Sequence, residues 1–199
     1  MGKYLRCFAA SAAFCLLLAA VFVTETRAQR ETYTGTVISY GSGFNTRTVT
    51  STFTLQINDR SSDQDAQRAL GILQESGQDA VLREYRNRNL GFFSVGARVG
   101  RRLNFVRESQ ENGRRRIFAV FERWMQFGEL RGGYRSVDYP FSVLELSLDP
   151  RTGNGDGTFI AAARVRFTTS GGQPTVEIEN FATFPARLMG VRQRNRNNR

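Results

Sequence analysis

The sequence predicts a mainly β domain, α+β by overall content, in which about eight mostly antiparallel strands form a barrel or a sandwich. Short runs rich in Thr, Val, Ile and Phe recur along the chain, several with alternating apolar residues. Clusters of Gly, Asn, Asp and Pro separate these runs, and such short turns join antiparallel neighbours. A segment with helical periodicity follows the second strand, so an antiparallel sheet wrapped around the helix is the alternative architecture.

The first half of the chain supplies two strands and the helical insertion. Residues 31–40 and 47–57 are rich in β-branched and aromatic side chains, and a glycine-containing turn separates them. Ser62 followed by Asp65 is typical of a helix N-terminus. Apolar residues then recur at helical spacing, with a break at Gly77. We therefore expect two short helices, or one helix kinked at this glycine, packed on the sheet.

The second half supplies the other strands, which we expect at residues 90–99, 103–107, 116–121, 134–148, 158–167 and 175–181. Asn112 and Gly113 form a favoured hairpin turn. Alternating apolar residues from Phe159 to Phe167 predict a central strand that faces the core. The small residues in its middle indicate a close layer above it, such as the helices.

The N-terminus predicts a secretory signal. Lys3 and Arg6 precede an uncharged apolar run at residues 7–23, and small residues at Thr26 and Ala28 fit a cleavage site. An uncleaved membrane anchor is the alternative. The predicted division is therefore a signal peptide at 1–28, a single β-rich domain at 29–191 and a basic disordered tail at 192–199. We expect an exported protein, periplasmic or extracellular, without a transmembrane span after cleavage.

The residue types that are missing exclude much of enzyme chemistry. Cys7 and Cys15 both lie in the predicted signal, so the mature chain forms no disulfide, which fits a bacterial envelope. The chain has no histidine, which excludes Ser-His-Asp triads, Cys-His pairs and zinc or haem sites built on these residues. We expect no cofactor.

The positive charge suits an anionic partner, although all-arginine usage more often reflects a GC-rich genome than a binding role. The net charge is +10, and every basic residue except Lys3 is arginine. An exported basic protein meets anionic envelope polymers or a lipid surface, whereas nucleic acid is a poor fit for an exported chain.

Glu145 is the candidate catalytic residue if the protein is an enzyme. The reaction considered is the hydrolysis of a polysaccharide by a pair of carboxylates. Glu145 shares a strand face with Phe141 and Val143, and an apolar surrounding raises the pKa of a carboxyl. The alternative is that Glu145 pairs with an arginine or lies on the solvated face, because leucines alternate with it on the other face.

The loop after residue 148 is a candidate metal site through Asp149, Asn154 and Asp156. Compared with a twelve-residue calcium loop, however, Thr152 stands where Asp is required and Ala163 where a bidentate Glu is required. The spacing therefore favours a structural hairpin loop.

Trp124, Tyr134 and Tyr139 are the candidate ligand-binding aromatics, with core packing as the alternative role. Together these observations predict an exported bacterial envelope protein that binds a ligand or partner without catalysis. A structural or adhesion component that binds anionic envelope polymers and the polysaccharide hydrolase are the two alternative functions.

Overall fold

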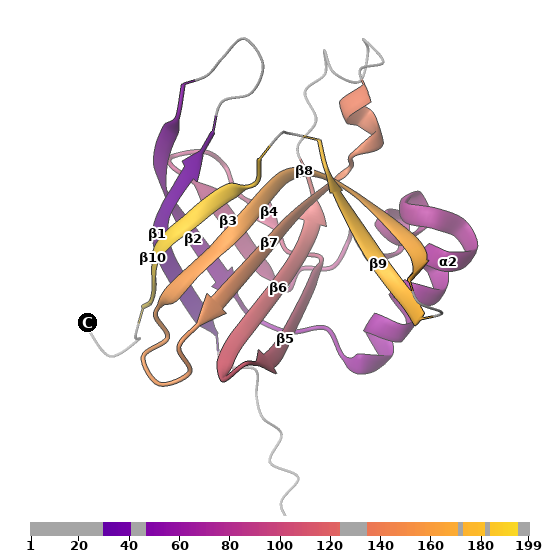
Figure 1. Ribbon diagram of the computed structural model, residues 1–199, viewed down its shortest axis with the longest axis horizontal. Coiled ribbons are helices and arrows are strands. Elements are labelled where there is room, and N and C mark those ends of the chain that lie inside the picture. Colours follow the sequence, from indigo (N-terminus) through magenta and orange to yellow (C-terminus); the bar gives the residue numbers. More distant parts are fainter. Residues whose placement is uncertain (1–29, 41–46, 124–134, 171–172, 182–183, 195–199) are drawn as a thin grey trace, which may run out of the picture.

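The computed structural model describes residues 30–40, 47–123, 135–170, 173–181 and 184–194 (Figure 1). The predicted signal peptide, Trp124 and Tyr134 lie outside the described residues. None of the helices in the described ranges has the length and hydropathy needed to cross a lipid bilayer.

The described chain forms a single antiparallel sheet that curls into a half-barrel, with one helical element, α2 (Asp63–Tyr85), after the second strand (Figure 1). The strand order is β4-β3-β2-β1-β10-β8-β7-β6-β5, and β9 pairs with β8 outside this path. The strands are β1 (Glu31–Ser39), β2 (Val49–Ile57), β3 (Gly91–Val95), β4 (Arg101–Arg102), β5 (Phe105–Glu111), β6 (Arg114–Glu122), β7 (Phe141–Leu148), β8 (Gly155–Ser170), β9 (Gln173–Asn180) and β10 (Ala186–Gln193). The predicted mainly β fold is confirmed, with a barrel-like sheet and the helix in the predicted place.

Two consecutive residues bring the two ends of this sheet together. The backbone N–H of Leu103 donates to the carbonyl of Gly91 in β3, and the N–H of Asn104 donates to the carbonyl of Val120 in β6. The Asn104 side chain adds a bond from the N–H of Glu122. Since β4 and β5 stand at opposite ends of the strand order, these bonds hold the curl of the sheet.

The inner face of the sheet is filled by side chains. Phe159 lies at the centre of an aromatic group, with its ring centroid 4.9 Å from that of Phe93 and 6.3 Å from that of Phe121. Leu144 and Leu55 beside them are fully buried. The interior of the half-barrel is therefore a packed core.

The helical element α2 is a hairpin of two helices. Ser62 caps it through a reciprocal capping box with Asp65, as the sequence predicts. Gly77 has a φ of 75° and a ψ of −177°, which breaks the helix at the predicted position. The Tyr85 hydroxyl donates to the carbonyl of Asp65 at 2.8 Å, whereas a straight helix would place these residues about 30 Å apart. The chain therefore reverses at Gly77.

A β-bulge divides β8 into two parts. Phe141 pairs with Ala163 and Val143 pairs with Ile160, so β8 has one residue more than β7 between these pairs. The prediction of one core face from Phe159 to Phe167 is wrong, because the extra residue reverses the alternation: Phe159 packs inside the half-barrel, but Ala163 packs in the outer cluster. The predicted close layer is confirmed, since the fully buried Ala163 lies beneath α2.

Several predicted boundaries change. The strand expected at 90–99 ends at Val95, because the next residue, Gly96, has a φ of 60° and turns the chain. The Asn112-Gly113 turn is confirmed by positive φ values at both residues. Strand β10 was missed, and it includes Arg192 and Gln193, which the prediction assigned to the tail. Polar side chains do not prevent pairing, and the backbone of both residues pairs with β1.

Gly77→Ala should lower the free energy of unfolding by about 1–3 kcal/mol, because non-glycine residues are strained at this φ and ψ. A methyl group there meets nothing within 4 Å, so the cost is that of the backbone alone. Gly71→Ala is the matched control, since it is also open but lies inside the helix, and it should raise stability by about 0.5–1 kcal/mol. Urea unfolding followed by circular dichroism measures both, and equal effects would contradict the reversal at Gly77.

Candidate ligand-binding site

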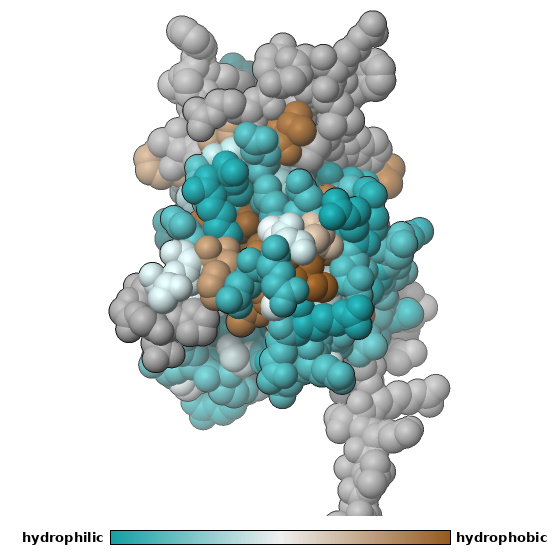
Figure 2. Space-filling model, turned by 90° about the vertical axis from the view of Figure 1, so that its right-hand side faces the viewer, coloured by the Kyte–Doolittle hydropathy of each residue, from teal (hydrophilic) through white to brown (hydrophobic). Residues whose placement is uncertain are grey.

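An apolar pocket of about 350 Å³ lies between α2 and the outer face of the half-barrel. On the side of the molecule that carries α2, Figure 2 shows apolar atoms surrounded by polar side chains. The pocket is bounded by α2, by the outer faces of β5, β6 and β7, and by the β8–β9 hairpin. Its apolar lining consists of Ala66, Ala69, Leu70, Leu73, Val81, Leu82, Tyr85, Phe105, Phe118, Val120, Phe121, Phe141, Val165, Val176 and Ile178.

Strand β6 supplies the floor because it is apolar on both faces. Ile117 and Ala119 point into the half-barrel and are fully buried, whereas Phe118 and Val120 point outward. These two outer side chains remain only partly buried although α2 covers them. The covering layer therefore does not fill the space above the floor.

The same incomplete burial is seen on the roof. Within α2, only Leu73 and Tyr85 are buried. Leu70 and Leu82 are partly exposed, and both line the pocket. Large apolar side chains on two facing walls thus keep accessible surface toward each other, which is the property of a binding pocket rather than of a close-packed interface.

The wall opposite β5 is the β8–β9 hairpin, which leaves the half-barrel beyond the bulge and lies near α2 (Figure 1). Val165 of β8 and Ile178 of β9 line the pocket from this side. Gln78, directly after the helix break, fixes the distance between roof and wall. Its Oε1 accepts from the N–H of Val165 at 3.1 Å, and its Nε2 donates to the carbonyl of Asp138 in the 3-10 helix η1 (Arg135–Asp138) at 2.9 Å.

The polar residues that line the pocket are Arg86, Asn104 and Arg107, which lie on the β5 side. Asn104 is buried, and its Nδ2 donates to the carbonyl of Arg86 at 3.0 Å. Arg86 pairs with Glu122 at 2.7 Å, and Arg107 pairs with Asp63 at 2.6 Å. The surface of the pocket itself is almost entirely apolar, so the guanidinium groups of Arg86 and Arg107 border it on the β5 side rather than face into it.

Asp65 joins the two ends of the helical hairpin at this site. Its carboxylate accepts from Arg88 at 2.5 Å, and hydrogen bonds from Arg88 and from the backbone of Ser62 hold its pKa well below the usual range. The same bonds fix the position of Tyr85, whose hydroxyl donates to the Asp65 carbonyl. The Tyr85 ring packs edge-on against the ring of Phe105, which also lines the pocket, with centroids 6.0 Å apart.

Of the aromatics that the sequence singles out, the structure describes Tyr139. It is buried, its hydroxyl donates to Glu179, and its ring packs against Phe181. It does not line the apolar pocket. Its observed contacts correspond to the packing role that was the alternative in the sequence.

Glu145 and Asp156 line a second, polar hollow of about 260 Å³ on the outer face of the sheet. Glu145 pairs with Arg116 at 2.5 Å, the contact that the alternative interpretation expected, while Leu144 and Leu146 lie in the core behind it. Asp156 lies 3.4 Å from Arg114. Both carboxylates thus have arginine partners.

The loop of Asp149 is organised by its own hydrogen bonds. The Asp149 carboxylate accepts from the N–H groups of Arg151 and Thr152, which lowers its pKa, and its backbone N–H donates to the carbonyl of Asn154. These are the contacts of a structural turn. The described residues, which include Asp149, Asn154 and Asp156, contain no group of three or more acidic, His or Cys side chains able to hold a metal ion.

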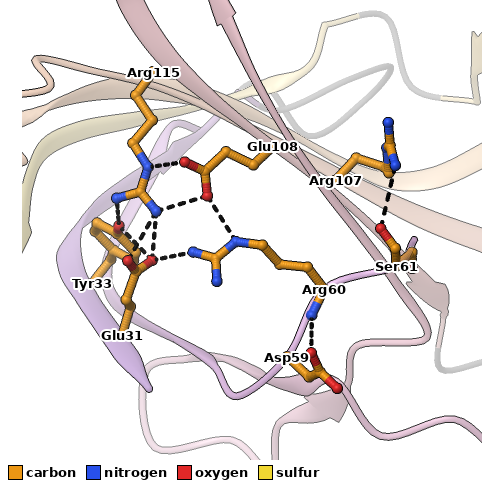
Figure 3. A network of polar contacts seen from close by, with 8 residues as sticks. All are labelled: Glu31, Tyr33, Asp59, Arg60, Ser61, Arg107, Glu108 and Arg115. Carbon is orange, nitrogen blue, oxygen red and sulfur yellow. Dashed lines mark hydrogen bonds and ion pairs between the residues drawn. The ribbon is translucent and has the colours of Figure 1, made fainter. Parts of the chain in front are cut away.

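A charge network closes one end of the half-barrel (Figure 3). Arg115 donates to Glu31 at 2.8 Å and to Glu108 at 2.6 Å, and Arg60 contacts the same two carboxylates at 2.8 and 2.7 Å. Tyr33 links Arg115 to Glu31 through its hydroxyl. Two positive and two negative side chains are thus mutually satisfied and tie β1, β5 and β6 together, which is a structural role.

No protein-family model matches the chain, and comparisons with curated proteins and with solved structures find no match. The geometry of the pocket therefore carries the functional argument.

The sequence did not reveal the pocket residues as a site. The available signal was the continuous apolar run from Ile117 to Phe121, because a strand that is apolar on both faces must be covered on both. The apolar stripe of the helix was recognised, but its partner on the outer face of β6 was not.

Arg115→Met should lower the free energy of unfolding by about 3 kcal/mol, because it leaves Glu31 and Glu108 close together with only Arg60 to neutralise them. The Arg115 and Glu31 side chains are only 15% and 13% exposed. Arg68→Met is the control, since the Arg68–Glu84 pair is exposed and should change stability by less than about 1 kcal/mol. Similar losses in both variants, measured by urea unfolding, would refute a structural role for the network.

Stability should decline in acid. Hydrogen bonds from Arg115 lower the pKa of Glu108, so this carboxyl binds a proton more readily in the unfolded chain. Its contribution is present above the unfolded pKa of about 4.3 and is lost as the pH falls through the lower pKa of the folded state. Urea midpoints should therefore fall below about pH 4, and they should fall less steeply in Arg115→Met, which lacks the main cause of this shift. If the urea midpoint fell equally steeply with pH in the wild type and in Arg115→Met, the contact between Arg115 and Glu108 would not be the cause of the acid sensitivity.

Proposed function

We propose that this protein binds a small apolar ligand in the pocket beneath α2. The observation that carries the proposal is a pocket whose lining, within the described part of the chain, is apolar except for Arg86, Asn104 and Arg107. Its volume lies within the roughly 300–1,000 Å³ typical of small-molecule sites. A ligand there gains the burial of apolar surface on both walls.

The lining supports binding rather than catalysis. Among the residues that the structure describes, the lining contains no carboxylate and no Ser, Thr or Cys side chain. The one hydroxyl, that of Tyr85, already donates to the Asp65 carbonyl. Asn104 donates to Arg86 and Arg88 and accepts from Glu122, so its amide is likewise engaged. The residues present exclude water and hold a shape, which is what a non-covalent carrier or sensor of an apolar molecule requires.

The biological setting is part of the proposal. The N-terminal basic and apolar segment supports export, and a bacterial envelope offers abundant acyl chains as ligands. Ion pairing within the fold uses many arginines, among them Arg60, Arg115 and Arg116. This internal use favours the ligand-binding proposal over adhesion to anionic polymers.

Filling the pocket tests the proposal. Nile red, an uncharged apolar dye, should bind the wild-type chain and raise its melting temperature by about 5–11 °C at one hundred times its Kd, since this concentration stabilises by ~2.7 kcal/mol and each kcal/mol shifts the Tm of such a chain by ~2–4 °C. Ala69→Trp and Val120→Phe, which fill the pocket from the roof and from the floor, should each weaken binding about tenfold or more.

Gln67→Trp is the matched control, because it places the same side chain on the exposed face of α2. It should bind the dye like the wild type. All variants keep the apolar N-terminal segment, which could itself bind the dye. A difference in dye affinity between the variants therefore reports on the pocket. Equal dye binding by the wild type, both filled variants and the control would place the dye elsewhere and overturn the proposal.

A further inference from the structure

We infer that the natural ligand is an anionic amphiphile whose chain lies in the apolar pocket and whose head group contacts Arg86 and Arg107. This inference rests on the proposed function and adds the chemical class of the ligand. The motivating observation is the asymmetry of the lining: its polar side chains gather on the β5 side, and the β8–β9 side is apolar. An amphiphile satisfies both sides at once.

The two arginines stand where a head group would meet solvent. Arg86 is the C-cap residue of α2, and Arg107 projects from the outer face of the edge strand β5. Phe105, which lines the pocket, precedes Arg107 by two residues and therefore lies on the same strand face. The side chains of Arg86 and Arg107 line the pocket and are 48% and 34% exposed, so both also reach water beside it.

Their present partners are exchangeable. Arg107 pairs with Asp63, whose side chain is 86% exposed, and Arg86 pairs with Glu122 near the same edge of the sheet. Exposed ion pairs of this kind contribute little, about 0–1 kcal/mol, so a bound anion can replace them or share the guanidinium. By contrast, Arg115 and Arg60 are enclosed between two carboxylates and are not available.

The charge of the lining selects against the other kinds of amphiphile. Among the described residues, two arginines and no acid line the pocket, and the nearby carboxylates of Asp63 and Glu122 are already paired with these arginines, so a cationic head group gains no unpaired acid from them. A guanidinium fork matches the paired oxygens of a carboxylate or a phosphate. A neutral amphiphile gains only the burial of its chain. Carboxylate and phosphate head groups share the required chemistry, and the experiment separates them.

The test compares amphiphiles that share one chain. Dodecanoate, dodecyl phosphate, dodecanol and dodecyltrimethylammonium compete with Nile red on the full wild-type chain, below their micelle concentrations and at low salt. Dodecanoate or dodecyl phosphate should bind about tenfold more tightly than dodecanol, and the cation more weakly than dodecanol. The tighter of the two anions identifies the head group, and added salt should reduce the difference.

The variant R86Q/R107Q should lose the preference for the anions over dodecanol, measured as the ratio of the two affinities. R68Q is the control, because Arg68 is an exposed arginine of α2 outside the pocket lining, and it should keep the preference. The single variants R86Q and R107Q, with folding checked by urea unfolding, should each lose part of it.

The outcomes separate this inference from the proposed function. Equal affinities of wild type for dodecanol and for both anions would overturn the anionic ligand and leave apolar binding intact. A preference that survives in R86Q/R107Q would also overturn it. The proposed function itself would be overturned if none of the four compounds displaced Nile red and if the filled variants Ala69→Trp and Val120→Phe bound the dye as tightly as the wild type.

Discussion

Strand β6 is apolar on both faces, and this constraint shapes everything outside the half-barrel. Its inner side chains complete the packed core, while Phe118 and Val120 on the outer face must be removed from water by another layer. Phe141 and Val143 extend the same outer surface into β7. The helical hairpin α2 and the β8–β9 hairpin provide the covering layer, and the candidate site is the space that they leave.

Two local irregularities make the covering possible. The left-handed backbone of Gly77 reverses the helix, so two short helices lie over the strands. The bulge in β8 reverses the alternation of its side chains. Before the bulge, Phe159 packs in the core of the half-barrel, and after it, Ala163 and Val165 pack in the outer layer. Interdigitated aromatic rings fill the core of the half-barrel, whereas the outer layer meets the sheet with partly exposed Leu and Val. The pocket follows from this difference in packing.

The arginine excess has two kinds of environment in the fold. At one end of the half-barrel, Arg60 and Arg115 are held between Glu31 and Glu108 and stabilise the junction of β1, β5 and β6 (Figure 3). Along the β5 side of the pocket, arginines are half-exposed and have single acidic partners. Net charge does not distinguish these environments, because burial and the number of partners decide whether a guanidinium is available to a ligand.

The sequence alone determined the features that depend on local chemistry: the strand and turn pattern, the capping box at Ser62, the helix break at Gly77 and the Asn112-Gly113 turn. It also limited the chemistry, since the chain has no histidine. Only the tertiary structure decided that β8 changes faces, that Arg192 and Gln193 join a strand, and that β5 to β7 support a pocket. Bulges, edge pairing and the fit between layers depend on contacts between residues far apart in the chain, which periodicity does not encode.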